Sequence, residues 1–159
     1  MGNIFSGSEI AELGIQIENN GRDFYGALAA NSKELKTREI FAFLSGEEEK
    51  HIETFKKISA SARSYKPKQA YPDEYFKYMS ALAGDYVFTQ KGKGKELAGK
   101  ISGEGEALDL AIRFEKDSIV FYEGMKNVVP ERDQGMVEEL IRQERSHLVS
   151  LSRLKEELS

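Results

Sequence analysis

Two copies of a Glu-x-x-His motif constrain the fold of this chain more than any other feature of its sequence. The motifs are Glu48–His51 and Glu144–His147, and they contain the only two histidines among the 159 residues. A separation of three residues is almost one turn of an α-helix, so both side chains of each motif are predicted to project from one helix face. Each motif therefore predicts a helix that carries an acid and an imidazole side by side.

The residues that surround each motif make that helix face apolar. Apolar side chains recur at alternating intervals of three and four residues, which is the seam pattern of a helical bundle. The apolar positions are Phe41, Leu44, Phe55, Ile58 and Ala62 around the first motif, and Val137, Leu140, Leu151, Leu154 and Leu158 around the second. A solvated helix face would explain a single motif, but it does not explain two motifs in two apolar seams. Ionisable groups inside such a seam need partners, because an unpaired buried charge costs several kcal/mol.

Two further seams carry one glutamate each. The first contains Ala11, Gly14, Glu18, Gly21, Tyr25 and Leu28, and the second contains Leu108, Ala111, Glu115, Ser118, Tyr122 and Met125. They match position for position, with a small residue three positions after the glutamate and a tyrosine seven positions after it. Glu18 precedes Glu48 by 30 residues, and Glu115 precedes Glu144 by 29. The chain is therefore predicted to contain two copies of one αα-hairpin.

Together the hairpins bring six possible metal ligands to the bundle interior: Glu18, Glu48, His51, Glu115, Glu144 and His147. Four carboxylates carry four negative charges, which two divalent cations would neutralise, and this is the ligand set of the di-iron carboxylate bundles. Carboxylate oxygen and neutral imidazole favour iron or manganese over copper. We therefore expect two iron ions, for which manganese or zinc could substitute. Glu48 and Glu144 are placed to bridge the two ions, whereas Glu18 and Glu115 would each bind one.

Two interpretations stay open for Tyr25 and Tyr122, which follow the lone glutamates by two helical turns. They could be core residues whose hydroxyl is hydrogen-bonded within the bundle. Alternatively, they could donate hydrogen bonds to ligand carboxylates, or act as radical-capable groups beside the metal. The acidic residues that lie off the seam lines are predicted to be surface charge: Glu47, Glu49, Glu138 and Glu139.

The expected fold is all-α, a four-helix bundle of two αα-hairpins in a single domain of residues 1–159. The helices are predicted at about 8–30, 32–62, 103–127 and 130–158, and Asn31 or Ser32 is expected to cap the second of them. Residues 64–102 would form the long crossover that a bundle needs when its second and third helices run parallel. Within it, a short helix is predicted from Pro72 to about Ala83, followed by a solvated loop at Lys91–Lys95.

Composition excludes several other classes of protein and site. The chain has no cysteine, which rules out disulfides, zinc ribbons, iron–sulfur clusters and a rubredoxin-type iron site within these residues. No apolar run approaches the ~20 residues of a membrane span. The net charge of −4 is too mild to indicate nucleic acid or an anionic membrane as a partner. No signal peptide is visible, so the expected location is cytoplasmic.

With these motifs the sequence resembles the rubrerythrin family of the ferritin-like superfamily, over nearly the whole chain. The resemblance implies a ferritin-like bundle, the same six metal ligands and a homodimer, in which the long crossover could let hairpins swap between chains. Rubrerythrins usually carry a rubredoxin domain with four cysteines, so for this chain a separate electron-donor protein such as a rubredoxin is expected. Rubrerythrins also tend to carry a further glutamate three residues after the third-helix ligand, where this chain has Ser118.

Three functions follow as hypotheses. The first is an oxidoreductase that reduces H₂O₂ or O₂ at a di-iron centre, as protection against oxidative stress. The second is a ferroxidase or iron-storage protein that oxidises Fe(II) and passes it on or keeps it. The third is a bundle that binds metal without turnover. The carboxylate that Ser118 replaces is associated with peroxide chemistry in the family, so the ligand count is closer to the bacterioferritin type.

Overall fold

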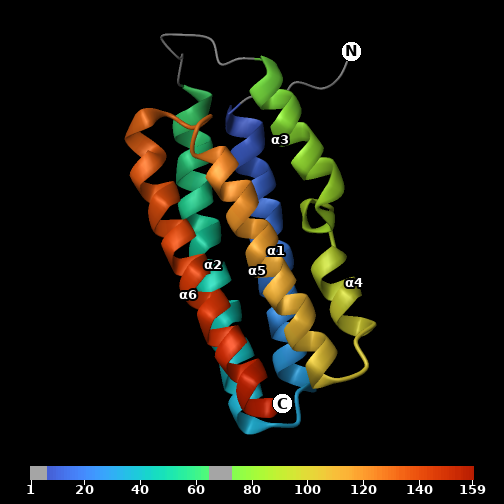
Figure 1. Ribbon diagram of the computed structural model, residues 1–159. Helices are drawn as coiled ribbons and strands as arrows, with labels where there is room; N and C mark the ends of the chain where they lie inside the picture. The colour runs from blue at the N-terminus through green and yellow to red at the C-terminus, as the bar shows by residue number, and fades with distance from the viewer. Residues whose placement is uncertain (1–6, 65–72) are drawn as a thin grey trace.

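The computed structural model describes residues 7–64 and 73–159, and four long helices form its bundle (Figure 1). One antiparallel hairpin consists of α1 (Gly7–Asn31) and α2 (Leu35–Arg63), and the other consists of α5 (Glu104–Met125) and α6 (Gln134–Leu158). Figure 1 shows that α2 and α5 run in the same direction, so the chain returns along the bundle between them. The predicted fold is confirmed: two αα-hairpins joined by a long crossover, with no β-strand in the described residues.

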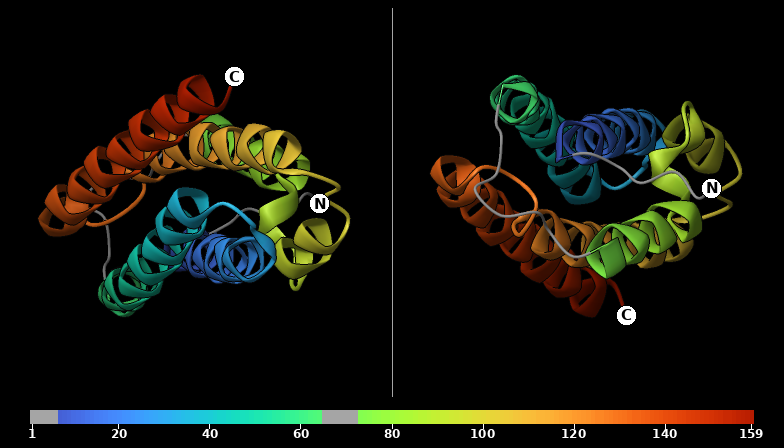
Figure 2. Two further views of the ribbon diagram at one scale, coloured as in Figure 1. Left: turned by 90° about the horizontal axis from the view of Figure 1, so that it is seen from below. Right: turned by 90° about the horizontal axis from the view of Figure 1, so that it is seen from above.

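The crossover lies along one side of this bundle. It contains α3 (Asp73–Asp85), the 3₁₀-helix η1 (Val87–Thr89) and α4 (Lys93–Gly99). Helix α3 packs on α5, whereas η1 and α4 pack on α1, and both views in Figure 2 show these segments at the outer edge of the bundle. The predicted short helix corresponds to α3, although Pro72, its predicted first residue, lies outside the described residues.

The starts of α2 and α6 differ from the predicted ones. Neither Asn31 nor Ser32 caps α2, which begins at Leu35 after Glu34. The reason is that the Ser32 hydroxyl donates to Glu104 Oε1 at the start of α5, at 2.8 Å. Before α6, a short 3₁₀-helix, η2 (Glu131–Asp133), stands where an α-helix was expected.

The prediction of a solvated loop at Lys91–Lys95 is wrong for its second half, because α4 begins at Lys93. A stretch rich in glycine and lysine has the composition of a loop. We attribute the formation of α4 to its contact with α1. At Gly94 the two backbones come so close that a Cβ atom would lie 1.9 Å from the carbonyl oxygen of Asn20. A glycine is therefore needed where α4 crosses α1.

Asn20, which is almost fully buried, ties the crossover to α1. Its Nδ2 donates to the carbonyl oxygens of Phe88 at 2.6 Å and Gln90 at 2.7 Å, and its Oδ1 accepts from the Gly94 N–H at 3.1 Å. Asn20→Ala would leave these groups unpaired, so we expect the free energy of unfolding to fall by about 2–4 kcal/mol and Tm by roughly 10 °C. Thermal denaturation against Asn19→Ala tests this, and an equal loss in the two variants would contradict it.

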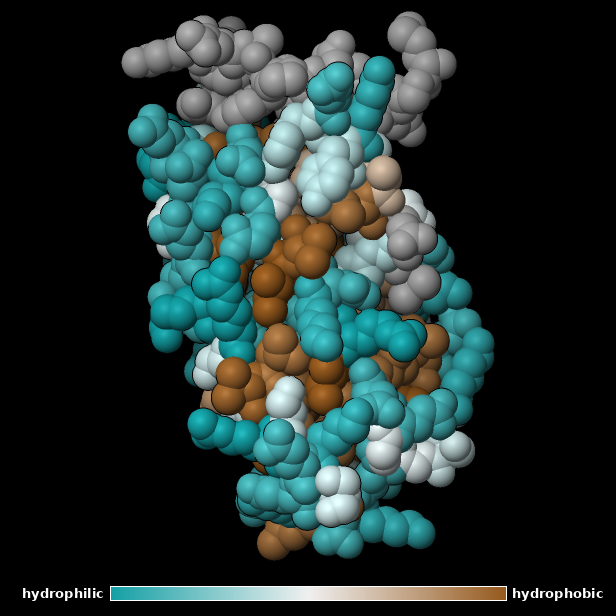
Figure 3. Space-filling model, in the orientation of Figure 1, coloured by the Kyte–Doolittle hydropathy of each residue, from teal (hydrophilic) through white to brown (hydrophobic). Residues whose placement is uncertain are grey.

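Most seam residues are buried as predicted, but Leu158 at the end of α6 is 47% exposed. Charged residues make up 31% of the chain, and Figure 3 shows hydrophilic side chains over most of the face formed by α5 and α6, with apolar ones between them. Within the described residues, no helix has the length and apolarity needed to cross a membrane. The interior is mostly apolar, and a layer of buried glutamates and histidines lies in the middle of the bundle.

Candidate metal centre

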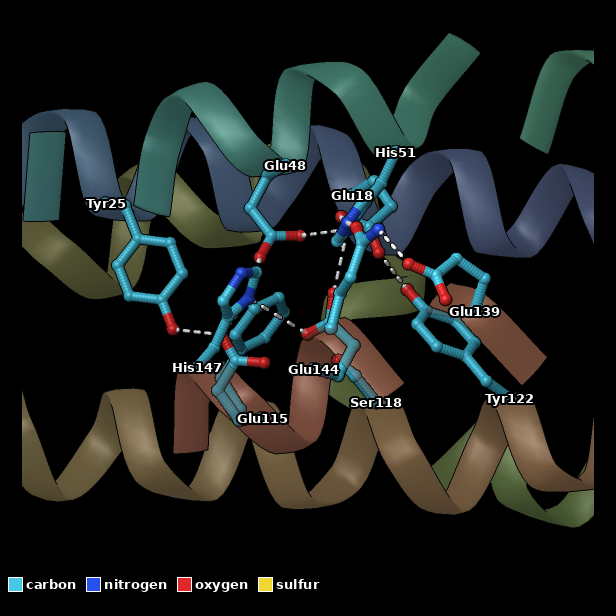
Figure 4. A network of polar contacts seen from close by, with 12 residues as sticks. Glu18, Tyr25, Glu48, His51, Glu115, Ser118, Tyr122, Glu139, Glu144 and His147 are labelled. Atoms are coloured by element: carbon cyan, nitrogen blue, oxygen red, sulfur yellow. Dashed lines mark hydrogen bonds and ion pairs between the residues drawn. The ribbon is translucent and has the colours of Figure 1, made fainter. Parts of the chain in front are cut away.

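Each of the four long helices brings one part of the predicted ligand set to this layer. Glu18 comes from α1, Glu115 from α5, and the two Glu-x-x-His motifs from α2 and α6. All four glutamates are fully buried, and the histidines are only 2% and 5% exposed. Figure 4 shows the side chains pointing toward one another from opposite sides of the bundle. The structure thus brings together all six residues that the sequence predicts as ligands.

The six residues form two overlapping groups that share two glutamates. The His51 subsite consists of Glu18, Glu48, His51 and Glu144, and the His147 subsite consists of Glu48, Glu115, Glu144 and His147. Within each subsite, one possible ligand atom of every residue lies within 4.8 Å of the others. Two shared carboxylates between two ion positions are the arrangement of a dinuclear centre.

The spacing of the facing atoms suits small divalent ions. In the His51 subsite, Nδ1 of His51 lies 2.8 Å from Glu144 Oε1 and 3.4 Å from Glu18 Oε2. In the His147 subsite, the nearest carboxylate oxygens lie 3.7 Å from the imidazole Nδ1. Two ligands at right angles, each about 2.1 Å from an ion, stand roughly 3 Å apart. Both subsites therefore have room for an ion, and the His51 subsite is the tighter of the two.

Most of these facing atoms have no hydrogen-bond partner. Among the described residues, Nδ1 of each histidine and both carboxylate oxygens of Glu48 and Glu144 are buried and unpaired, as is Oε2 of Glu18 and of Glu115. Even the 2.8 Å contact between His51 and Glu144 lacks the geometry of a hydrogen bond. Buried polar atoms in proteins are nearly always paired. Here, nitrogen and oxygen atoms of the kind that bind metals face one another without partners. Metal ions between them would supply the missing partners.

Tyr25 and Tyr122 donate hydrogen bonds to the two unshared glutamates. The Tyr25 hydroxyl on α1 donates to Glu115 Oε1 on α5, and the Tyr122 hydroxyl on α5 donates to Glu18 Oε1 on α1, each at 2.6 Å. Burial raises the pKa of both phenols well above the usual value, so they remain neutral donors. Both tyrosines are core residues, and their hydroxyls donate to glutamates that the sequence predicts as metal ligands.

Burial and mutual charge shift the protonation of the metal-free cluster. Burial, followed by the charge of Glu144, raises the pKa of Glu115 well above its usual value. Burial by itself would lower the pKa of His51, but the nearby carboxylates of Glu144 and Glu48 outweigh it and raise that pKa to about 11. The metal-free cluster is therefore expected to hold protons, which metal ions would displace on binding.

Sequence patterns do not single out Gln143, which contacts His51 across the bundle. Nε2 of His51 lies 2.6 Å from Oε1 of Gln143, and Nε2 of Gln143 donates to Glu139 Oε1 at 2.8 Å. Both oxygens of Glu139 accept from the guanidinium group of Arg142. Glu139 is exposed, as predicted for surface charge, but it also holds the amide that contacts His51. This contact joins α2 and α6, so no pattern within either helix reveals it.

Tyr86 of the crossover is a second residue near the site that the sequence does not predict. Its hydroxyl lies 2.8 Å from Ser118 Oγ and donates to the carbonyl oxygen of Phe114 at 3.2 Å. Ser118 is fully buried one helical turn after Glu115. A serine–tyrosine pair thus stands where rubrerythrins tend to carry a further glutamate. Among the described residues, no additional acidic side chain joins the cluster.

Glutamine in place of Glu18 is expected to stabilise the metal-free protein. The change removes a buried carboxylate, while an amide oxygen can still accept from Tyr122. We expect the free energy of unfolding to rise by about 1 kcal/mol and Tm by roughly 2–4 °C. Calorimetry in the presence of a chelator measures this, with Glu12→Gln on the exposed face of α1 as the control. A lower Tm for Glu18→Gln would count against a buried, charged Glu18.

Comparisons with known proteins point in the same direction as this geometry. The sequence model of the Rubrerythrin family matches residues 9–155. A crystal structure from Thermotoga maritima, described as that of a ferritin-like diiron-carboxylate protein, aligns over 100% of both chains with a TM-score of 0.72 and 26% sequence identity. No curated protein matches the chain. The structural match confirms the ferritin-like bundle over its full length.

Proposed function

The chain belongs to the rubrerythrin family, and from this premise we propose that it is a di-iron oxidoreductase that reduces H₂O₂ or O₂ and protects against oxidative stress. One observation carries the proposal: imidazole and carboxylate atoms of six buried residues face one another without hydrogen-bond partners. Oxygen and imidazole ligands of this kind suit iron. Because two glutamates are shared between the subsites, two ions are better placed than one to neutralise the four carboxylates.

When bound in the two subsites, two iron(II) ions would supply the two electrons with which one H₂O₂ and two protons become two water molecules. The residues of the chain hold and shield this centre. Glu48 and Glu144, which belong to both subsites, would help to hold both ions, and Glu18 with His51 or Glu115 with His147 would complete each subsite. The hydroxyls of Tyr25 and Tyr122 keep the unshared carboxylates in place. Aromatic rings packed on these tyrosines exclude water; that of Phe55 lies 4.9 Å from the Tyr122 ring, centroid to centroid.

Each turnover would need two further electrons from outside the centre. The sequence contains no cysteine and therefore no rubredoxin-type iron site of its own. We propose that a separate electron-donor protein, such as a rubredoxin, supplies these electrons.

Oxidation of iron as a substrate is the second candidate function, and the surroundings of Ser118 favour it. The family associates a carboxylate at this position with peroxide chemistry, whereas here the serine Oγ contacts the Tyr86 hydroxyl at 2.8 Å. Without that carboxylate, six predicted ligands remain, and this number is closer to that of the bacterioferritin type. Iron(II) would then be oxidised in the cluster and passed on or stored.

Metal content is the first test of these proposals. After anaerobic loading with Fe(II) and removal of loose metal, two irons per chain are expected, and none or one would overturn the dinuclear site. The loaded protein is then mixed with H₂O₂ or O₂ in separate experiments. Fast oxidation by H₂O₂ and slow oxidation by O₂ would support peroxide reduction. Continued uptake of many irons per chain would support iron handling, and tight zinc binding without a redox response would leave a non-catalytic site.

A further inference from the structure

The two subsites have matching ligands but hold their histidines differently. Each contains one unshared glutamate that accepts a hydrogen bond from a tyrosine at 2.6 Å, so the carboxylates are held alike. The difference lies at Nε2 of the histidines, the ring nitrogen that does not face the cluster. Partners of this nitrogen matter because they fix the tautomer and the orientation of a ligating imidazole.

Gln143 fixes the tautomer of His51. The Glu139 carboxylate pairs with Arg142 and can only accept hydrogen bonds, so the Gln143 group that faces it at 2.8 Å is the NH₂ end of the amide. The other end, Oε1, therefore faces His51, and an N–H on the imidazole Nε2 must donate to it at 2.6 Å. A neutral imidazole with its proton on Nε2 carries its lone pair on Nδ1. That nitrogen faces the carboxylates of the His51 subsite.

No comparable partner holds His147. The residue of α2 that corresponds to Gln143 of α6 is Glu47, since each stands one residue before its Glu-x-x-His motif. Glu47 accepts from Lys50 Nζ at 3.1 Å instead, and among the described residues no hydrogen bond reaches Nε2 of His147. The outer neighbour of this imidazole is the ring of Phe43, edge-on at 6.4 Å and itself 60% exposed. On the side away from the cluster, no hydrogen bond from the described residues fixes the orientation of the His147 ring.

The distances within the cluster agree with this difference. The closest imidazole–carboxylate approach is 2.8 Å in the His51 subsite and 3.7 Å in the His147 subsite. Figure 4 shows Glu139, the residue that holds the Gln143 amide, on the side of the cluster where His51 lies, away from His147. An imidazole that is already aligned loses less freedom when it binds an ion, so the ion beside it is bound more tightly.

We propose that Gln143 is a positioning residue that makes the two metal positions unequal, with a tightly held ion in the His51 subsite and an exchanging ion in the His147 subsite. This inference rests on the proposed dinuclear site. Hydrogen-bond partners of ligating histidines typically change metal affinity 10–100-fold. The dissociation constants of the two positions are expected to differ by a factor of this size. When metal is removed, the ion in the His147 subsite is therefore lost first.

Calorimetric titration of the metal-free full chain with Co²⁺ tests the inference. The wild type is expected to bind two ions, with dissociation constants that differ about 10–100-fold. Gln143→Leu removes the acceptor and should weaken the binding of the tighter ion by about this factor. Glu139→Gln and Gln143→Glu together keep an acceptor beside His51 Nε2 and an amide donor beside that acceptor, so this exchange should retain most of the affinity. The matched control is Glu47→Leu, which changes the corresponding residue of α2 and should leave both events unchanged.

A second readout separates positioning from a general loss of structure. Co²⁺ shifts the proton resonances of bound imidazoles, and the His51 Nε2–H should give one slowly exchanging signal that disappears in Gln143→Leu. The inference would be overturned if the wild type bound both ions with equal dissociation constants, or if Gln143→Leu left the smaller dissociation constant unchanged. Either result would leave the dinuclear site intact. Fewer than two ions in the wild type would overturn the proposed function and the inference with it.

Discussion

Alanine in place of Glu144 is expected to reduce the protein from two tightly bound metal ions per chain to at most one. Oε1 of Glu144 lies 2.8 Å from His51 Nδ1, and Oε2 lies 3.9 Å from His147 Nδ1, so one carboxylate faces both subsites. Its removal takes a ligand from each ion and one of the two negative charges between them. Glu48→Ala is expected to do the same, because its oxygens face the two histidines at 3.7 Å each.

Metal analysis after anaerobic loading with Fe(II) measures this loss. Glu138→Ala, on the exposed face of the same helix, is the control for Glu144→Ala and should retain two irons. The helical circular dichroism of the metal-free variants is expected to persist, because each change leaves the apolar core of the four long helices in place. Two tightly bound irons in either Glu144→Ala or Glu48→Ala would contradict the assignment of these glutamates as shared ligands.

Metal loading is expected to raise Tm by roughly 10–20 °C above that of the chelator-treated protein. Each ion that binds only the folded state, at a free concentration 100 times its dissociation constant, adds about 2.7 kcal/mol. Two ions therefore add about 5 kcal/mol. For a chain of this length, each kcal/mol shifts Tm by roughly 2–4 °C. The physical cause is that the metal-free bundle buries unpaired carboxylate and imidazole atoms in its centre.

Differential scanning calorimetry with Mn²⁺, Fe²⁺ under anaerobic conditions, and a chelator measures the shift. Glu144→Ala supplies the internal control, since it should lose most of the metal-dependent rise while Glu138→Ala keeps it. Equal Tm values with and without metal in the wild type would mean that the facing atoms of the cluster do not bind ions.

The meeting of the six clustered residues was predictable from periodicity and loop position. In an antiparallel hairpin, residues equally far from the loop lie at the same height. Glu18 and Glu48 are equidistant from position 33, which falls in the short connection between α1 and α2. Glu115 and Glu144 are likewise centred on the connection before α6. Seam spacing then turns all four carboxylates inward, where the structure finds them fully buried.

The crossover was less predictable, because its structure depends on contact with the bundle. The stretch around Lys93 has the composition of a solvated loop, yet it forms α4 where Gly94 meets the backbone of Asn20. Asn20 gives no signal in the sequence, since its three hydrogen bonds all reach residues of a distant segment. Ser32 has the side chain of a helix cap but donates to Glu104 instead, because α5 begins beside it.

The sequence by itself determined the helical fold, the hairpin repeat and the set of acids and histidines that face the bundle interior. Only the tertiary structure decided that Tyr25 and Tyr122 each contact the glutamate of the opposite hairpin, and that Gln143, but not Glu47, holds a histidine. The physical reason is that periodicity reports which face of a helix is buried. How two helices rotate and cross, and therefore which side chains meet, is set by packing across the whole core.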